Sequence, residues 1–380
     1  MMMDYIGLQQ TPLLVLLNII IMLYFFVTLK SALDCFGVIP KDRFFFAKFL
    51  IFLFCLFSFW GTDWFHYAQI FARIKYYGGT HMEDVYSSIV QFSPDYLFFR
   101  LVVWGVALLF AFNSFKRICA NNVLAVLIFS SIWLLWFSYA RVSLAMALMF
   151  WGVSIAYKPL LNKKIISFII ALCAIFVSFY FHKTAAFGIG IILIAILANK
   201  LNHRIAFILP IVLIPIEYLL VQNFLVDYML ADVGLEDGFF EMSMISGQNY
   251  LGRDESVGGI GANIARFLEL TPYYLSAVCC LKLSRIKNFF VVTPNYIRIF
   301  VYIAFYIILL SSVFAFDFGY STAILYCRFM RFAFLPCVIV ITYCYEVAET
   351  HKIAKFVVYL GMLSTMYQLL YAFYCALSKQ

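Results

Sequence analysis

Long runs of apolar residues, separated by shorter polar stretches, dominate the chain. Most runs are close to ~20 residues, the length with which an α-helix crosses a bilayer. Strands of a membrane barrel would instead alternate apolar and polar residues over ~10 positions, which these runs do not do. The pattern predicts about twelve transmembrane helices: 11–29, 44–61, 97–115, 121–137, 139–157, 165–181, 184–199, 204–222, 263–281, 296–316, 328–345 and 353–376.

The composition strengthens the membrane interpretation. Hydrophobic residues make up 65% of the 380 residues, charged residues make up 12%, and the mean hydropathy is +0.96. A soluble domain carries about 25% charged residues, so this excess of apolar surface needs lipid around it. We therefore expect an all-α polytopic integral membrane protein, folded as a single transmembrane domain over 1–380. The first run follows the acidic Asp4, which argues against a cleavable signal peptide.

Most basic residues lie in every second connection between the predicted spans. The positive-inside rule places these connections in the cytoplasm and both termini outside. The net charge of +8 then reflects topology, and it does not indicate nucleic-acid binding. The basic residues of the first, third, fifth, seventh, ninth and eleventh connections are Lys30, Lys41, Arg43, Lys116, Arg117, Lys158, Lys163, Lys164, Lys200, Arg204, Lys282, Arg285, Lys287, Arg298, Lys352 and Lys355.

Two connections are much longer than the others, and both fall on the external side. They cover about 62–96 and 223–262. The second is rich in glycine with interleaved acidic residues and asparagines, which favours a flexible cover over a substrate. Long loops in compact proteins are usually functional or disordered.

A group of basic residues on the external side opposes the topological bias. Charges at or within spans are costly and usually functional. Arginine binds two phosphate oxygens at once through its planar guanidinium. The group therefore indicates a polyanion at the outer leaflet, such as a lipid-linked pyrophosphate, with pairing to external carboxylates or phospholipid headgroups as the alternative. Its members are Arg73, Lys75, Arg100, Arg141, Lys183, Arg253, Arg266, Arg328 and Arg331.

One polar cluster stands at the external end of the second predicted span. Asp63, His66 and Tyr67 are spaced so that they can share one helix face, with Trp64 beside them. A carboxylate, an imidazole and a phenol together suit sugar binding or proton transfer. An interfacial belt of aromatic residues with polar tips is the alternative interpretation.

Two further clusters flank the sixth predicted span and its predecessor. Arg141 opens an apolar helix, where the helix dipole disfavours a cation unless an anion such as phosphate is bound. His182 and Lys183 lie between two apolar helices, and a histidine there suits a base near neutral pH. The alternative for the second cluster is a turn of hydrated polar residues.

Signatures of nucleotide, metal and hydrolase sites are missing from the sequence. There is no Walker loop, no H-E-x-x-H and no G-x-S-x-G. The ten cysteines are scattered through apolar runs, and there are five histidines. We therefore expect no metal and no cofactor.

The stretch from Arg141 to Ala186 resembles the EpsG family of polysaccharide polymerases, relatives of the Wzy O-antigen polymerases. Arg141-Val-Ser-Leu-Ala-Met-Ala147 opens a span, a basic Asn162-Lys-Lys164 turn follows, and the next span ends in Phe181-His-Lys-Thr-Ala-Ala186. Pro94-Asp-Tyr96 and the pair Arg328 and Arg331 extend the resemblance. Val142 stands where the family often has Gln.

The resemblance implies a GT-C-like membrane glycosyltransferase of the bacterial inner membrane, active at the periplasmic or extracellular face. Such an enzyme would transfer the growing glycan from undecaprenyl pyrophosphate onto the terminal sugar of a new lipid-linked repeat unit. Its partners would be undecaprenyl-pyrophosphate-linked oligosaccharides, membrane lipid and a regulator protein of chain length.

On this hypothesis, each candidate residue has one of three roles. His182 or Asp63 would deprotonate the acceptor hydroxyl, with Arg141 as a further catalytic residue. The pyrophosphate would be held by Arg141, Arg328, Arg331, Arg266 and Lys183. The sugars would be bound by Trp64, His66, Tyr67, Asp95, Tyr96 and Arg253.

Two other functions compete with the polymerase. A flippase or transporter of lipid-linked oligosaccharides would need polar groups along a path through the membrane, and the spans offer mainly Glu217, Glu269 and Asn263. A glycan-modifying acyltransferase would need a donor site on the cytoplasmic side, where only the basic residues of the connections are found.

Overall fold

The computed structural model describes residues 12–35, 38–57, 62–77, 84–137, 140–159, 164–182, 185–220, 260–286, 289, 293–312 and 329–377. In this part of the chain every regular element is a helix. In chain order they are α2 (Pro12–Asp34), α3 (Lys41–Phe57), α4 (Thr62–Tyr77), α5 (Asp84–Phe92), α6 (Tyr96–Ile118), α7 (Asn122–Ile128), η1 (Phe129–Trp133), α8 (Leu134–Phe137), α9 (Ala140–Tyr157), α10 (Lys164–Phe181), α11 (Ala185–Ala198), α12 (His203–Leu220), α15 (Ile260–Ser284), α17 (Asn295–Ser311), α19 (Phe334–Glu346) and α20 (His351–Leu377).

Each predicted span coincides with described helical structure. The fourth is built from α7, the π-helix η1 and α8, and the eleventh from a helical turn at 329–331 followed by α19. Four stretches are long and apolar enough to cross a membrane: Leu16–Asp34, Tyr96–Ile118, Lys164–Phe181 and His351–Leu370. Several shorter apolar helices accompany them. The protein is therefore an all-helical, multi-pass membrane protein.

Contacts between polar groups join the basic connections at one end of the bundle. Lys158 Nζ donates to the carbonyl of Arg117 at 2.6 Å, which links the fifth connection to the third. The same Nζ lies 4.2 Å from the centre of the Tyr296 ring, in the first turn of α17 directly after the ninth connection.

The remaining basic connections are tied to the same end. The side chains of Asn199 and Asn295 are hydrogen-bonded at 2.6 Å, which adds the seventh connection. The amide of Asn121 donates to Glu346 at 3.0 Å, which adds the eleventh. An ion pair of 3.6 Å between Lys355 and Asp34 adds the first. The structure thus gathers all six basic connections at one end, as the alternating charge pattern predicts.

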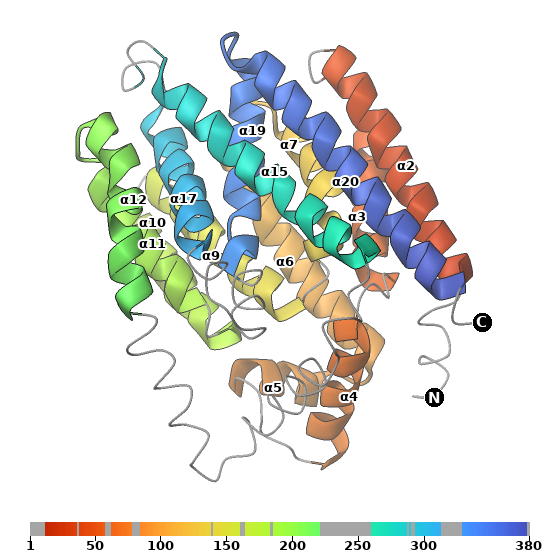
Figure 1. The fold of residues 1–380 in the computed structure, drawn as a ribbon. Coiled ribbons are helices and arrows are strands. Elements are labelled where there is room, and N and C mark those ends of the chain that lie inside the picture. Colours follow the sequence, from red (N-terminus) through yellow and green to blue (C-terminus); the bar gives the residue numbers. More distant parts are fainter. Residues whose placement is uncertain are drawn as a thin grey trace.

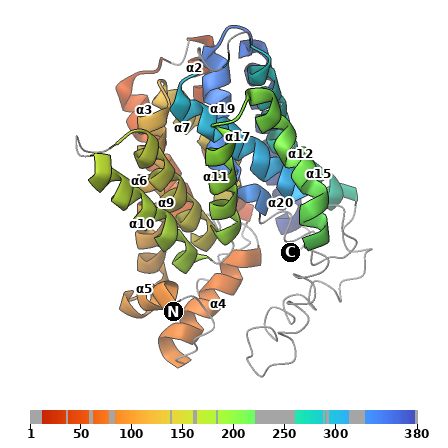
Figure 2. The same cartoon turned by 90° about the vertical axis from the view of Figure 1, so that its left-hand side faces the viewer.

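The other end of the bundle carries the helices α4 and α5, which lie below the remaining helices in Figures 1 and 2. The sequence predicted a long loop over 62–96, and this prediction was wrong for most of the segment, because α4 and α5 occupy it. The second predicted span overlaps α3, which is described as far as Phe57, and residues 58–61 lie outside the described residues. The second predicted loop, 223–262, lies outside the described residues apart from its last three positions, which begin α15.

The centre of the bundle is formed by α17 and α19, which are buried on nearly all sides. A helix that is apolar all round packs in the interior rather than at a surface. The pair lies between α11 and α12 on one side and α15 and α20 on the other in Figure 1. This position places the residues just before α19 inside the protein.

Candidate functional site

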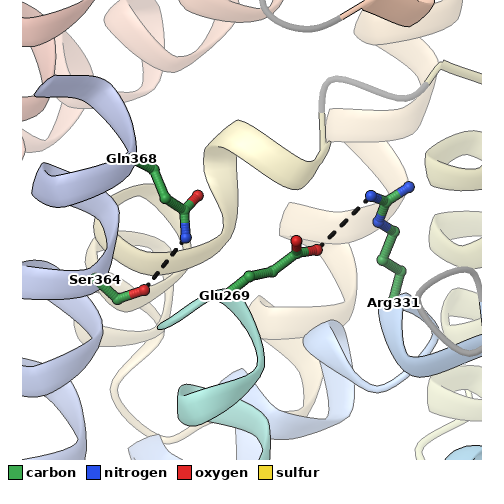
Figure 3. A network of polar contacts seen from close by, with 4 residues as sticks. All are labelled: Glu269, Arg331, Ser364 and Gln368. Atoms are coloured by element: carbon green, nitrogen blue, oxygen red, sulfur yellow. Dashed lines mark hydrogen bonds and ion pairs between the residues drawn. The ribbon is translucent and has the colours of Figure 1, made fainter. Parts of the chain in front are cut away.

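An ion pair between Glu269 and Arg331 lies inside the bundle (Figure 3). One guanidinium nitrogen of Arg331 is 3.7 Å from Oε1 of Glu269, and the two side chains are 13% and 7% exposed. Glu269 projects from α15, and Arg331 ends the helical turn at 329–331 that precedes α19. Two opposite charges in an apolar interior are tolerated because each offsets the desolvation of the other.

A proline in α15 determines how the backbone beside Glu269 is held. Pro272 has no amide hydrogen, so the carbonyl of Leu268 lacks its usual donor four residues later in the helix. The hydroxyl of Ser364 on α20 donates to this carbonyl at 2.6 Å. The interhelical bond therefore satisfies the carbonyl that the proline frees, and it fixes α15 against α20 next to Glu269.

Ser364 is itself part of a short chain of polar side chains. Nε2 of Gln368, one helical turn further along α20, donates to the Ser364 hydroxyl at 3.3 Å. Ser364 and Gln368 are both buried, and Figure 3 shows them on the opposite side of Glu269 from Arg331. The carboxylate thus lies between a guanidinium and a group of uncharged polar side chains.

The ion pair lies well away from the end that carries the basic connections. Arg331 is separated from that end by the 13 residues of α19, about 20 Å at 1.5 Å per residue. Ser364 is 13 positions into α20 from His351, which gives a similar distance. Since the hydrocarbon core of a bilayer is about 30 Å thick, the network lies in the half nearer to α4 and α5.

His182 lies in the tight connection between α10 and α11, and it is buried at 8% exposure. Its amide donates to the carbonyl of Ser178 at 3.2 Å, and its carbonyl accepts from the amide of Ala185 at 2.9 Å. The backbone of His182 therefore closes one helix and opens the next. The sequence allowed a turn of hydrated polar residues here, and the turn is present, but the side chain of His182 is buried in it.

The start of α11 packs on the segment that carries Arg331. The rings of Phe187 and Phe329 have their centres 4.3 Å apart. A Cβ added at Gly188 would lie 3.1 Å from Phe332. The structure therefore brings the connection that contains His182 and the turn that contains Arg331 to the same end of the bundle.

Arg100 has a structural role that the charge pattern did not reveal. It is 4% exposed, and its Nε and a terminal nitrogen donate to the carbonyls of Leu56 and Cys55 at 3.0 and 2.6 Å. These carbonyls belong to the last described turn of α3, and carbonyls at the end of a helix take donors from outside it. A cation is also favoured at this negative end of the helix dipole. Arg100 therefore caps α3.

Asp95 and Tyr96, which were expected to contact sugar, begin α6. The Asp95 side chain accepts from the amide of Phe98 at 2.7 Å, so it is the N-cap of the helix. The ring of Tyr96 packs against Phe71 of α4, with the centres 5.5 Å apart. The contact of Tyr96 holds α4 to the start of α6, whereas the Asp95 cap lies within α6. The roles of both residues in sugar binding stay predictions.

The other candidate residues are placed only by their helices or not at all. Arg253, Arg328 and Lys183 lie outside the described residues. Six more lie in described helices with side chains outside the description: Asp63, Trp64, His66 and Tyr67 in the first part of α4, Arg141 at the start of α9 and Arg266 in α15, one turn before Glu269.

The contribution of Glu269, Ser364 and Gln368 was not predicted from the sequence. Glu269 was recognised as one of few polar residues within the spans, and an ionisable residue in such a position is a functional candidate by default. The sequence alone was therefore enough to select Glu269 as a candidate. Nothing in the sequence pairs it with Arg331, 62 positions later. Among the described residues, no group of three or more His, Cys, Asp or Glu could hold a metal ion.

Among the comparisons with known proteins, a match was found to one family model. No curated protein and no solved structure matches the chain. The EpsG family model matches residues 43–379, which is most of the chain and includes every helix from α4 to α20. The chain therefore belongs to the EpsG family, which is associated with exopolysaccharide biosynthesis.

Proposed function

We propose that this protein is a Wzy-like, GT-C-like glycosyltransferase that polymerises lipid-linked oligosaccharide repeat units at the external face of the membrane. Membership in the EpsG family supports a role in exopolysaccharide biosynthesis, with which the family is associated. The side of the membrane follows from the six basic connections, which the positive-inside rule assigns to the cytoplasm. The end with α4 and α5 is then periplasmic or extracellular.

The observation that carries the proposal is the place of Arg331. It is a largely enclosed arginine in the half of the bundle away from the basic connections, paired with the carboxylate of Glu269. A pyrophosphate carried on a membrane lipid reaches this half from the outer leaflet. Arginine suits it because the planar guanidinium binds two phosphate oxygens, and the dry surroundings strengthen the attraction.

The reaction exchanges one bond at the anomeric carbon of the growing glycan. The bond from this carbon to the pyrophosphate breaks, and a bond to a hydroxyl oxygen of the new repeat unit forms. The hydroxyl proton passes to a base, for which His182 and Asp63 are the candidates, and undecaprenyl pyrophosphate leaves. Arg331, with Arg141, Arg266, Arg328 and Lys183, would stabilise the negative charge on the leaving group.

The location of the described polar network argues against a flippase. The described polar network is confined to one half of the bundle, and it does not continue to the end with the basic connections. A flippase would need polar groups for the headgroup on both sides of the membrane centre. The network therefore fits chemistry at one face better than passage across.

Deletion of the gene tests the proposal against both competitors. We expect the mutant to carry single repeat units on lipid in the outer leaflet, detected by mass spectrometry of lipid-linked glycans. Loss of a flippase would leave the same units in the cytoplasmic leaflet, where an impermeant periodate reagent does not reach them. Loss of an acyltransferase would leave long chains that lack acyl groups. Either of these two results would reject the polymerase.

A further inference from the structure

The ion pair between Glu269 and Arg331 is buried but long. Its shortest separation is 3.7 Å, whereas a charge-assisted hydrogen bond between a guanidinium and a carboxylate is typically about 2.7–2.9 Å. The carboxylate is therefore close enough to neutralise Arg331, and it does not form the short two-bond contact that would bind the guanidinium most tightly.

The pair is a poor device for stability alone. Taking two charges out of water costs about as much as their attraction returns, and buried pairs are often replaced by apolar residues without loss. The bond from Ser364 to the carbonyl of Leu268 already joins α15 to α20 at this level. Glu269 adds to this bond a negative charge beside Arg331.

We propose that Glu269 is the resident counter-ion of a phosphate site at Arg331, and that the pyrophosphate of a polyprenyl ligand exchanges with it. Without ligand, the carboxylate keeps the buried guanidinium neutralised. When the pyrophosphate arrives, its oxygens take over the contact, and Glu269 repels the bound anion. This repulsion limits the affinity and promotes release of the polyprenyl pyrophosphate product. The role rests on the proposed function, because that function supplies the ligand.

The proposal predicts that a substitution inside the site increases the affinity for the anion. Replacing Glu269 by glutamine removes the competing charge and keeps the size of the side chain. Two unit charges about 6 Å apart interact appreciably at an effective dielectric constant near 20, which corresponds to a change in affinity on the order of 10- to 100-fold. Binding of the anion should therefore become tighter, whereas turnover should fall because the product leaves more slowly.

Equilibrium dialysis of radiolabelled farnesyl pyrophosphate with the purified full-length protein measures this effect. We expect E269Q to bind roughly 10-fold or more tightly than the wild type, and R331A to lose binding. E269D keeps the charge, so it should not show the gain in affinity expected of E269Q. Farnesol, which lacks the pyrophosphate, should show no difference between the wild type and E269Q.

The control is a matched ion pair at the other end of the bundle. Asp34 and Lys355 are 3.6 Å apart and partly exposed, and D34N removes one carboxylate there. It should leave farnesyl pyrophosphate binding unchanged. E269M, an apolar replacement of similar length, is a second variant that should also bind more tightly. Thermal unfolding identifies variants that do not fold.

Several results would overturn the proposal. The first is binding of farnesyl pyrophosphate by E269Q and E269M that is weaker than or equal to that of the wild type. The second is an equal effect of D34N, and the third is no binding by the wild type. The fourth is failure of both E269Q and E269M to fold, because the ion pair would then have a structural role. The proposed function is judged separately. Tight binding of farnesyl pyrophosphate by E269Q without any polymer formation by the wild type would reject the polymerase and keep the exchange site.

Discussion

Two buried arginines of this protein show how differently the same residue type is used at the scale of single side chains. Arg100 directs two nitrogens to the last carbonyls of α3. Arg331 faces a carboxylate from another helix. Both belonged to the external basic group that the sequence linked to a polyanion. The first joins α6 to α3, and the second is the one for which we propose exchange of its partner with a ligand.

Removal of the Arg100 cap should destabilise the protein. In R100A the carbonyls of Cys55 and Leu56 lose their donors in a buried place, which costs about 1–3 kcal/mol for each unsatisfied group. We expect a clear fall in the temperature of thermal unfolding in detergent. Arg43 is exposed on α3, and R43A should change stability by less than about 0.5 kcal/mol. Equal unfolding temperatures for both variants would refute the capping role.

The bond between Ser364 and Leu268 should matter only while residue 272 is a proline. S364A leaves the Leu268 carbonyl without its described donor, at a cost of about 1 kcal/mol for an interhelical bond in a membrane protein. P272A restores the amide hydrogen that a helix normally supplies to this carbonyl. A double-mutant cycle by thermal unfolding should show that S364A costs little in the P272A background. Additive effects would contradict this account.

The sequence identified Arg331 as a candidate because its charge opposes the topological bias, and it noted Glu269 as an unusual polar residue. It did not join them, because the two positions lie on separate helices and no local periodicity connects them. The role of Ser364 was equally hidden. A serine in an apolar span is common, and its partner exists only because Pro272 lies on the neighbouring helix.

At the scale of helices, α9 and α10 approach each other closely at Gly152. A Cβ added at Gly152 would lie 2.7 Å from the carbonyl oxygen of Ala171 and 3.3 Å from the Cβ of Ala174. Small residues at such contacts let helix backbones come together in membranes. Arg141 lies in the first turn of α9 and His182 follows the end of α10, so this contact holds together the two helices that carry these candidate residues.

Substitution of Gly152 should therefore separate α9 from α10. G152A forces a backbone to shift, and we expect a loss of stability on the order of 1–3 kcal/mol, together with lower polymerase activity. Gly190 of α11 is the matched control, because a Cβ there meets nothing within 4 Å. G190A should be neutral or stabilising by up to about 1 kcal/mol, as alanine favours helices. A stable, active G152A variant would show that the contact is unimportant.

The long helices were predictable, and the short ones were not. Apolar runs near 20 residues leave the helix as the main way to satisfy the backbone in lipid, so the spans follow from length and composition. The helices α4 and α5 carry more polar residues, and a polar segment between two apolar runs is predicted as a loop from its sequence. The sequence placed the Asp63 cluster at the end of a span, whereas the structure places it at the start of α4 (Thr62–Tyr77).

At the scale of the whole molecule, the charge distribution gives the bundle two distinct ends. One end holds the six basic connections, and the other holds α4, α5 and the connection at His182. The sequence predicted this arrangement correctly because the positive-inside bias is a property of whole loops, which does not depend on side-chain detail. The structure adds the depth of the ion pair, which requires the packing of α15, α19 and α20.

Labelling of introduced cysteines tests this orientation. Ser88 on α5 and Lys200 in the seventh connection are both exposed and lie at opposite ends. In intact cells, an impermeant maleimide should label S88C and should label K200C only after the membrane is broken. The protein without an added cysteine corrects for labelling of its own cysteines. The reverse pattern would place the proposed site in the cytoplasm.

The most direct test of the central claim is polymerisation by the purified protein. The protein in lipid nanodiscs is incubated with undecaprenyl-pyrophosphate-linked repeat units taken from the deletion strain, and the products are separated by size. We expect a ladder of glycans that grow by one repeat unit per step with release of undecaprenyl pyrophosphate, and no ladder with R331A. Repeat units that stay single with folded wild-type protein, or an unchanged ladder with R331A, would contradict the account.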